Sequence, residues 1–143
     1  MTKDYALAGL RLGYAVGPEP LIERLAAFRP PWNVNALALA GSLAALEDHA
    51  YLSRSLFKLR EAHQQLVHDL RGCGLEPLPS ATHFFLVRVG DGAAFRSRLL
   101  TRGILVRDCA SFSLPEFVRI ATRRPKENTR LIQTLQEMRT CLT

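Results

Sequence analysis

A chain of 143 residues with 48% hydrophobic and 22% charged residues has the composition of one folded globular domain, which excludes an intrinsically disordered protein. Its apolar runs are shorter than the roughly 18 residues of a membrane span and its start lacks a signal-peptide pattern, so we expect a cytoplasmic protein with no membrane partner. The net charge of +6 lies mostly in residues 73–143, where eleven basic residues face six acidic ones, but these form no contiguous stripe and we expect no nucleic-acid partner.

The first third of the chain predicts an extended stretch followed by helices. Residues 10–16 form the extended stretch, and Gly17-Pro18 then offers a helix start, because proline is favoured in the first helical turn. Pro30-Pro31 ends that helix. Residues 36–48 are rich in alanine and leucine, which predicts a second helix that is mostly buried.

A longer helix is predicted from residue 49 to the turn Gly72-Cys73-Gly74, because its apolar residues recur in steps of three and four. They are Leu52, Leu56, Leu59, Leu66 and Leu70. His63 occupies the missing place in this stripe and has no apparent partner for metal binding or proton transfer, so we expect a packed histidine. The three cysteines, Cys73, Cys109 and Cys141, lack metal-ligand spacing and are expected to be free thiols, which excludes a zinc site.

The second half of the chain predicts alternating strands and helices. Three segments have the aromatic and β-branched content of strands: 83–89, 104–107 and 117–122. Asp91 is a plausible N-cap for a helix over residues 93–102, which Gly103 stops. Pro125 begins the last helix, whose inner face carries Leu131, Leu135, Met138 and Leu142.

The first residues of the chain carry the most informative motif. The run from Thr2 to Tyr14, TKDYALAGLRLGY, places Lys3 eight residues before Arg11, with Gly9 between them. This run resembles the cofactor-lysine segment of the pyridoxal-phosphate-dependent class I/II aminotransferases, most closely the branch that holds histidinol-phosphate aminotransferase and threonine-phosphate decarboxylase.

The resemblance implies roles for both residues. Lys3 would bond to the aldehyde of pyridoxal 5'-phosphate and move the proton at the α carbon of the substrate, for which it must react as a neutral amine. Arg11 would grip the cofactor phosphate, a task suited to a planar, permanently charged guanidinium. Gly9 and Gly13 would let the backbone pass close to the ligand. Without the resemblance, Lys3 would be read as an ordinary surface lysine.

Two later stretches extend the resemblance along the chain. Residues 30–38, PPWNVNALA, are similar to a Pro-aromatic-x-Val-Asn segment of the family, which suggests that Asn33 binds substrate. The segment ILVRDC at 104–109, followed by FVRIA at 117–121, resembles the closing substrate-binding pair of the family. By that resemblance Arg119 binds the α-carboxylate of the substrate, and Arg107 faces the substrate and meets its phosphate. Tyr5 and Tyr14 are expected to pack rather than react.

The resemblance also implies a fold. We expect the α/β class, an α+β sandwich that corresponds to the C-terminal small domain of the aminotransferase fold with a remnant of the large domain. Residues 1–48 would form the remnant of the cofactor-binding large domain with linker helices, and residues 49–143 the small domain. The aspartate that meets the cofactor's pyridine nitrogen and the glycine-led phosphate loop precede the lysine in the family, so neither can be assigned here.

The expected function follows from these assignments. The chain is the C-terminal portion of an aminotransferase or decarboxylase that acts on a small, phosphorylated amino acid or amine, and the whole enzyme is a homodimer. Alone, the 143 residues are expected to have no useful turnover. The competing interpretation is a natural stand-alone interaction module without catalysis, in which self-association covers the apolar face of residues 6–48.

Overall fold

The computed structural model describes the backbone of residues 1–140 and the side chains of residues 1–138. The expectations for Cys141 and Leu142 therefore lie outside the described residues. The chain divides into two compact units, Met1–Ser55 and Leu56–Thr143, named unit 1 and unit 2. The predicted division into domains at residues 48 and 49 stays a prediction.

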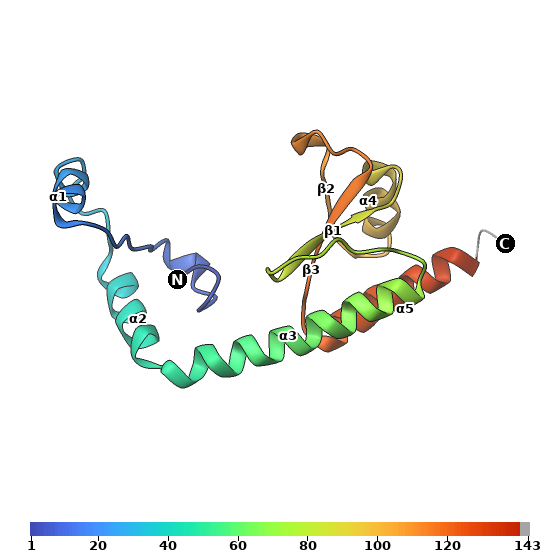
Figure 1. Ribbon diagram of the computed structural model, residues 1–143, viewed down its shortest axis with the longest axis horizontal. Coiled ribbons are helices and arrows are strands. Elements are labelled where there is room, and N and C mark those ends of the chain that lie inside the picture. Colours follow the sequence, from blue (N-terminus) through green and yellow to red (C-terminus); the bar gives the residue numbers. More distant parts are fainter. Residues whose placement is uncertain (141–143) are drawn as a thin grey trace. The chain divides into compact units, whose positions relative to one another are not determined.

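Unit 1 consists of short helices joined by irregular backbone (Figure 1). They are a 3-10 helix at Ala8–Leu10, α1 at Glu19–Ala27, α2 at Ala36–Glu47 and the start of α3, which covers His49–Gly72. The helices agree with the sequence prediction, and Asn35 caps α2 by accepting a hydrogen bond from the backbone N–H of Ala38 at 2.8 Å. The predicted extended stretch at 10–16 is only partly right, because Leu10 closes the 3-10 helix and the backbone is irregular from residue 12 onward.

The predicted burial of α2 is wrong. The helix forms, but Ala38 and Ser42 are its only buried residues. Its leucines lie exposed, and Leu37 is 80% accessible. Alanine and leucine favour a helix through their backbone preference alone, whereas burial requires a covering surface. The described residues supply no such surface for α2.

Unit 2 contains a three-stranded antiparallel sheet in the order β1-β3-β2 (Figure 1). The strands are β1 at Phe84–Arg88, β2 at Arg107–Asp108 and β3 at Phe117–Ala121. Three helices pack with the sheet, namely the second part of α3, α4 at Gly92–Leu100 and α5 at Pro125–Thr140. This is the predicted mixed α/β arrangement of a small sheet and helices.

The core of unit 2 lies between one face of the sheet and the three helices. Residues of β1 and β3 alternate between buried and half-buried, and the buried set is Phe85, Val87, Val118 and Ile120. The helices contribute Leu66, Leu70, Phe95, Leu99, Leu131 and Leu135, among others. Each such large side chain contributes about 1.5–3 kcal/mol when it leaves water. The other face of the sheet is therefore the one available to a ligand.

The strand predicted at 104–107 is displaced in the structure. Only Arg107 and Asp108 pair with β3. The backbone N–H of Ile104 instead donates to the carbonyl of Leu99 at 3.0 Å, where Gly103 with φ of 72° closes α4. Because the backbone N–H of Ile104 completes the end of α4, it is not available for hydrogen bonds in the sheet.

His63 is a packed helix histidine, as predicted. Its Nδ1 lies 3.0 Å from the hydroxyl oxygen of Thr122, and its ring meets the ring of Phe85 edge-on with centroids 5.2 Å apart. The histidine therefore joins α3 to the sheet and needs no ligand. No group of metal-binding side chains occurs within the described residues.

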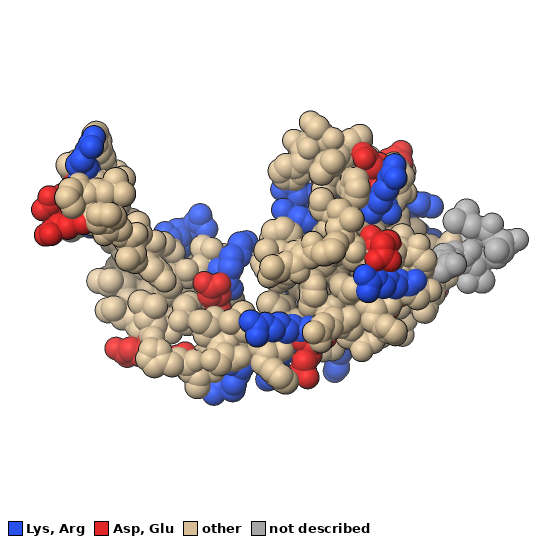
Figure 2. All heavy atoms as spheres, viewed as in Figure 1, with Lys and Arg blue, Asp and Glu red and all other residues tan. Residues whose placement is uncertain are grey.

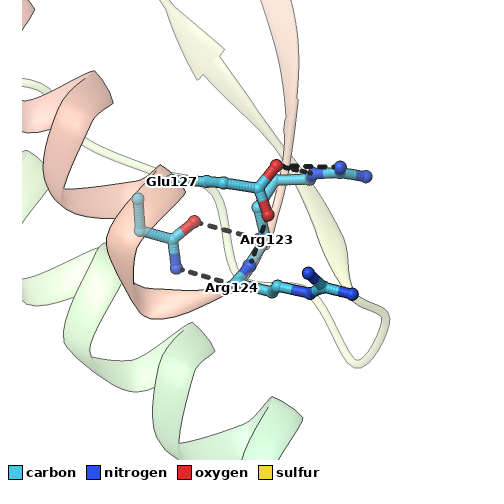
Figure 3. A network of polar contacts seen from close by, with 4 residues as sticks. Arg123, Arg124 and Glu127 are labelled. Carbon is cyan, nitrogen blue, oxygen red and sulfur yellow. Dashed lines mark hydrogen bonds and ion pairs between the residues drawn. The ribbon is translucent and has the colours of Figure 1, made fainter.

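A polar network closes the start of α5, which begins at Pro125 as predicted (Figure 3). The carboxylate of Glu127 accepts hydrogen bonds from the guanidinium of Arg123 at 3.2 and 2.9 Å and from the backbone N–H of Arg124 at 3.3 Å. The buried side chain of Asn128 accepts from the backbone N–H of Arg123 at 2.9 Å and donates to its carbonyl at 3.1 Å. The hydrogen bond from Arg123 holds the pKa of Glu127 below its ordinary value.

Lys and Arg side chains are spread over the face of the molecule shown in Figure 2 and do not gather in a stripe. Among the described side chains, three arginines form ion pairs: Arg71 with Glu76, Arg96 with Asp108 and Arg123 with Glu127. Within the described part of the chain, every helix is too short or too polar to cross a membrane.

Candidate functional site

The candidate lysine and arginine of unit 1 lie on either side of the 3-10 helix. Lys3 is exposed in a turn in which its carbonyl accepts a hydrogen bond from the N–H of Ala6 at 3.4 Å. Arg11 follows the helix, and its guanidinium donates to the carbonyl of Ala8 at 2.9 Å. Neither side chain forms an ion pair with a described residue. An amine and a guanidinium are thus presented without a protein counterion.

The backbone around these two residues leaves open space. A Cβ atom added to Gly9 or Gly13 would meet no atom within 4 Å. That space fits the predicted approach of a ligand to the backbone, although the role of the two glycines stays a prediction.

Backbone strain is concentrated in the segments that carry candidate residues. Among the described residues, four that are not glycine have a left-handed backbone: Ala6, Arg11, Trp32 and Ser113. The first two belong to the lysine segment, Trp32 precedes Asn33, and Ser113 follows the turn that contacts Arg107. Such conformations cost energy and tend to occur at functional sites. The observed strain therefore supports a functional reading of all three segments.

The aromatic residues of unit 1 differ in how far they are exposed to solvent. Tyr5 stacks on Tyr51 with ring centroids 6.2 Å apart, so its predicted packing role is confirmed. Tyr14 is 70% exposed, so the same prediction is wrong for it. Trp32 is 97% exposed and the neighbouring Asn33 is exposed as well. These two present a polar and an aromatic group to solvent.

The two candidate arginines of unit 2 lie directly opposite each other. Arg119 occupies the middle of β3, where it pairs with Leu86 of β1 on one side and with Arg107 of β2 on the other. Directly opposite residues of an antiparallel pair point to the same face, and the neighbours of Arg119 in the strand, Val118 and Ile120, are buried on the other. Both guanidiniums therefore lie on the face away from the core, here named the arginine face.

Each of the two guanidiniums lies over an aromatic ring. The Cζ atom of Arg119 is 5.0 Å from the ring centroid of Phe84, and that of Arg107 is 4.8 Å from the ring centroid of Phe112. Arg107 also reaches the hydroxyl of Ser111 at 3.5 Å. The sequence analysis assigned no role to either phenylalanine. Strand alternation places Phe84 opposite in direction to the core residue Phe85, but its pairing with a particular arginine depends on the register of the sheet.

Protein groups near the arginine face do not neutralise it. Asp108 pairs with the buried Val118, which places it on the core side, and its carboxylate lies 3.9 Å from Nε of Arg96. Burial raises the pKa of the Cys109 thiol, against the opposing effect of Arg119, so the thiol stays neutral at pH 7. Like charges directly opposite in a sheet repel. The arrangement therefore favours an anion from outside the protein.

The structure brings together Arg107 and Arg119, and it holds Lys3, Arg11 and Asn33 within unit 1. The roles assigned to these five residues stay predictions. Unit 1 thus offers an amine, a guanidinium and an amide, and unit 2 offers two adjacent guanidiniums suited to binding an anion.

The chain is similar to known proteins in both sequence and structure. The histidinol-phosphate aminotransferase 1 of Thiobacillus denitrificans is 42% identical over 96% of this chain and 36% of its own length. The structure of L-threonine-O-3-phosphate decarboxylase from Porphyromonas gingivalis has a TM-score of 0.84 at 33% identity and covers 96% of this chain and 44% of its own. That of histidinol-phosphate aminotransferase from Sinorhizobium meliloti in complex with pyridoxal-5'-phosphate has a TM-score of 0.83 at 30% identity over 99% of this chain and 40% of its own.

These similarities confirm the fold class and the resemblance predicted from the sequence. The chain spans 36% of the length of the first of these relatives. The family described as aminotransferase class I and II matches residues 1–135, from the lysine segment to the last helix. The chain belongs to the class I and II aminotransferase family.

Proposed function

We propose that this chain is part of a pyridoxal-phosphate-dependent enzyme that transfers an amino group from a small phosphorylated amine or amino acid. The observation that carries the proposal is the pair of directly opposed arginines on one face of the sheet, without a neutralising carboxylate, in a chain whose family match includes Lys3 and Arg11. The name of the relative at 42% identity supports histidinol phosphate as the substrate.

The residues of unit 1 suit the cofactor. Lys3 would hold pyridoxal 5'-phosphate through its amine, and Arg11 would bind the phosphate through its guanidinium. When bound, the cofactor supplies an electron sink for the carbanion at the α carbon of the substrate. The similar Sinorhizobium meliloti structure in complex with pyridoxal-5'-phosphate supports this choice.

The remaining roles belong to groups that bind and orient the substrate. The amine of Lys3 would in addition take the proton from the α carbon of the substrate, the step that begins amino transfer. Arg119 and Arg107 hold the phosphate of histidinol phosphate together, or the carboxylate and the phosphate of an amino-acid phosphate separately, through paired N–H donors, and Asn33 adds a hydrogen bond. Fixing both ends of a small molecule removes much of its freedom before reaction and lowers the barrier accordingly.

Decarboxylation of an amino-acid phosphate is a second candidate reaction. The threonine-phosphate decarboxylase structure at 33% identity favours it. The two reactions differ in which bond at the α carbon is aligned for cleavage. They also differ in their anions, because threonine phosphate carries a carboxylate and a phosphate, whereas histidinol phosphate carries only the phosphate. We infer that Arg119 binds the carboxylate and Arg107 the phosphate of an amino-acid phosphate.

The whole protein is proposed to be a cytoplasmic homodimer, and the 143-residue chain alone is proposed to lack turnover. The experiment is an assay of the complete protein, upstream sequence included, for amine loss from histidinol phosphate with a 2-oxo acid present as the acceptor of the amino group, and for release of CO2 from threonine phosphate. Lys3→Ala should abolish the reaction. Arg119→Leu should lower kcat/KM by about 10- to 100-fold, as expected for a lost charged hydrogen bond. Arg98→Leu on α4 serves as the control, and full activity of Lys3→Ala would contradict the proposal.

A non-catalytic interaction module remains a candidate because of one observation. Unit 1 exposes many large apolar side chains, including Val16 at 89% and Phe28 at 85%. A surface of this kind is covered in proteins that self-associate. Sedimentation of the 143-residue chain distinguishes the two cases, since a module should form a defined oligomer without binding an apolar dye, whereas an uncovered enzyme part should bind the dye and aggregate.

A further inference from the structure

On the arginine face, each of the two arginines lies over an aromatic ring instead of pairing with a carboxylate. A guanidinium that lies over a ring keeps its N–H edges free, whereas a guanidinium paired with a carboxylate has those donors occupied. Both candidate arginines are supported by rings and neither pairs with a described acidic residue. The donors that an anionic ligand needs are therefore left available.

The rings also oppose repulsion between the arginines. Directly opposite like charges in a sheet push the side chains apart. The attraction of a cation to a ring is about 0.5–1 kcal/mol when exposed and about 2 kcal/mol when shielded from water, which is similar in size to such a repulsion. Phe84 and Phe112 can thus hold two neighbouring guanidiniums on one face before a ligand arrives.

The two supports differ in rigidity. Phe84 is half-buried in β1 and fixed by pairing with Ala121 of β3. Phe112 is 53% exposed and ends the short 3-10 turn Ala110–Phe112, which the strained Ser113 follows. The ring under Arg119 is therefore part of the sheet, whereas the ring under Arg107 belongs to a turn.

We propose that Phe84 and Phe112 are positioning residues that orient Arg119 and Arg107 for anion binding. Phe84 holds Arg119 in one position, whereas Phe112 supports Arg107 in a position that can adjust. This inference rests on the proposed function, because it takes the two arginines as the sites for the substrate anions. Neither phenylalanine needs to touch the ligand. The effect of each is exerted through one arginine.

The test uses NMR of the complete protein, upstream sequence included, and O-phosphothreonine as the probe. A ring below a guanidinium shifts the Nε–H and Cδ–H proton signals of that arginine upfield. Phe112→Leu should remove the shift of Arg107 alone and weaken probe binding by about two- to fivefold, the size of an exposed cation–ring contact. Phe84→Leu should remove the shift of Arg119 and weaken binding by about tenfold. The tyrosine variant of each should restore both the shift and the affinity.

Three controls separate the possible outcomes. Phe57→Leu changes an exposed phenylalanine of α3 and should alter neither arginine, and Arg98, which lies over Phe95, provides an unchanged internal reference. Core methyl signals report whether the Phe84→Leu variant still folds. If it does not, Phe112→Leu still tests the inference, because Phe112 is exposed and its replacement should not disturb the fold. Unchanged affinity after loss of the ring shift overturns the inference while leaving the arginine sites intact. Unchanged affinity in Arg119→Leu and Arg107→Leu overturns the proposed function itself.

Discussion

The two units bury their apolar residues to very different extents. In unit 2 the core of leucine, valine, isoleucine and phenylalanine side chains is buried between the sheet and three helices. In unit 1 the buried residues are Ala38 and Ser42, and the leucines of α1 and α2 lie exposed. Both units contain similar apolar sequences. Helix formation is thus achieved in both, but burial is achieved only where another layer covers the helix.

The candidate residues of the two units differ in the same way. The arginine face of unit 2 stands on a sheet with a packed core, which holds Arg119 between paired strands. Lys3 and Arg11 stand on irregular backbone and a three-residue helix. We infer that the packed core of unit 2 holds the proposed substrate-binding arginines in place, whereas the described residues give the proposed cofactor-binding residues of unit 1 no comparable support.

The largest effect is expected when the units are separated. Residues 56–143 expressed alone should keep a cooperative thermal transition in circular dichroism, because the core cluster lies within them. Residues 1–55 should lack such a transition, because isolated helices of this length are marginal in water. A cooperative transition in residues 1–55 alone would show that the exposed apolar surface is not what limits unit 1.

Alanine substitution of one leucine in each unit measures the same difference in burial. Leu70 on α3 is fully buried and Leu37 on α2 is 80% exposed. Leu70→Ala should lower the free energy of unfolding by about 2–5 kcal/mol, from lost burial and the cavity left behind. Leu37→Ala should change it by less than about 0.5 kcal/mol. Urea unfolding of both variants checks the prediction, and equal losses would contradict it.

Buried polar residues extend the comparison. Asn128 in unit 2 makes two hydrogen bonds to the backbone of Arg123, whereas the buried hydroxyl of Ser42 in unit 1 has no partner among the described residues. Asn128→Ala should cost about 1–3 kcal/mol because it leaves backbone groups unpaired. Ser42→Ala should be neutral or stabilising, because it removes an unpaired group. Thermal unfolding of the two variants gives the sign, and a loss in Ser42→Ala would indicate an undetected partner.

The sequence predicted those features that depend on local signals. Asp91 accepts from the N–H of Ala94 at 2.9 Å as the cap of α4, Gly103 ends that helix, and Pro125 begins the next. Each of these signals acts within about one helical turn. Strand alternation is a local signal of the same kind, since it places Arg119 on the face opposite to the buried Val118 and Ile120.

Features that depend on distant parts of the chain were not predictable in this way. A two-residue strand such as β2 is too short to show periodicity, and the backbone N–H of Ile104 bonds to the end of α4. The exposure of Leu37 depends on what covers α2. The contacts of Phe84 with Arg119 and of Phe112 with Arg107 depend on strand register and on a turn, neither of which a pattern of residue types specifies.

The smallest effect is expected at the polar network that begins α5. The pKa of Glu127 is held below its ordinary value, chiefly by the hydrogen bond from Arg123. The ionised carboxylate therefore stabilises the folded state above the ordinary glutamate pKa, and this contribution is lost as the pH falls through the lowered pKa. Because the carboxylate is exposed to solvent and salt, the effect is small.

Glu127→Gln should lower the Tm slightly at pH 7 and match the parent chain in acid. In unit 1 the exposed Glu19 lies in the first turn of α1 without such a network, so Glu19→Gln serves as the control variant. Equal pH profiles for the two variants would mean that the Arg123 contact adds nothing to the ordinary attraction between a carboxylate and a helix N-terminus.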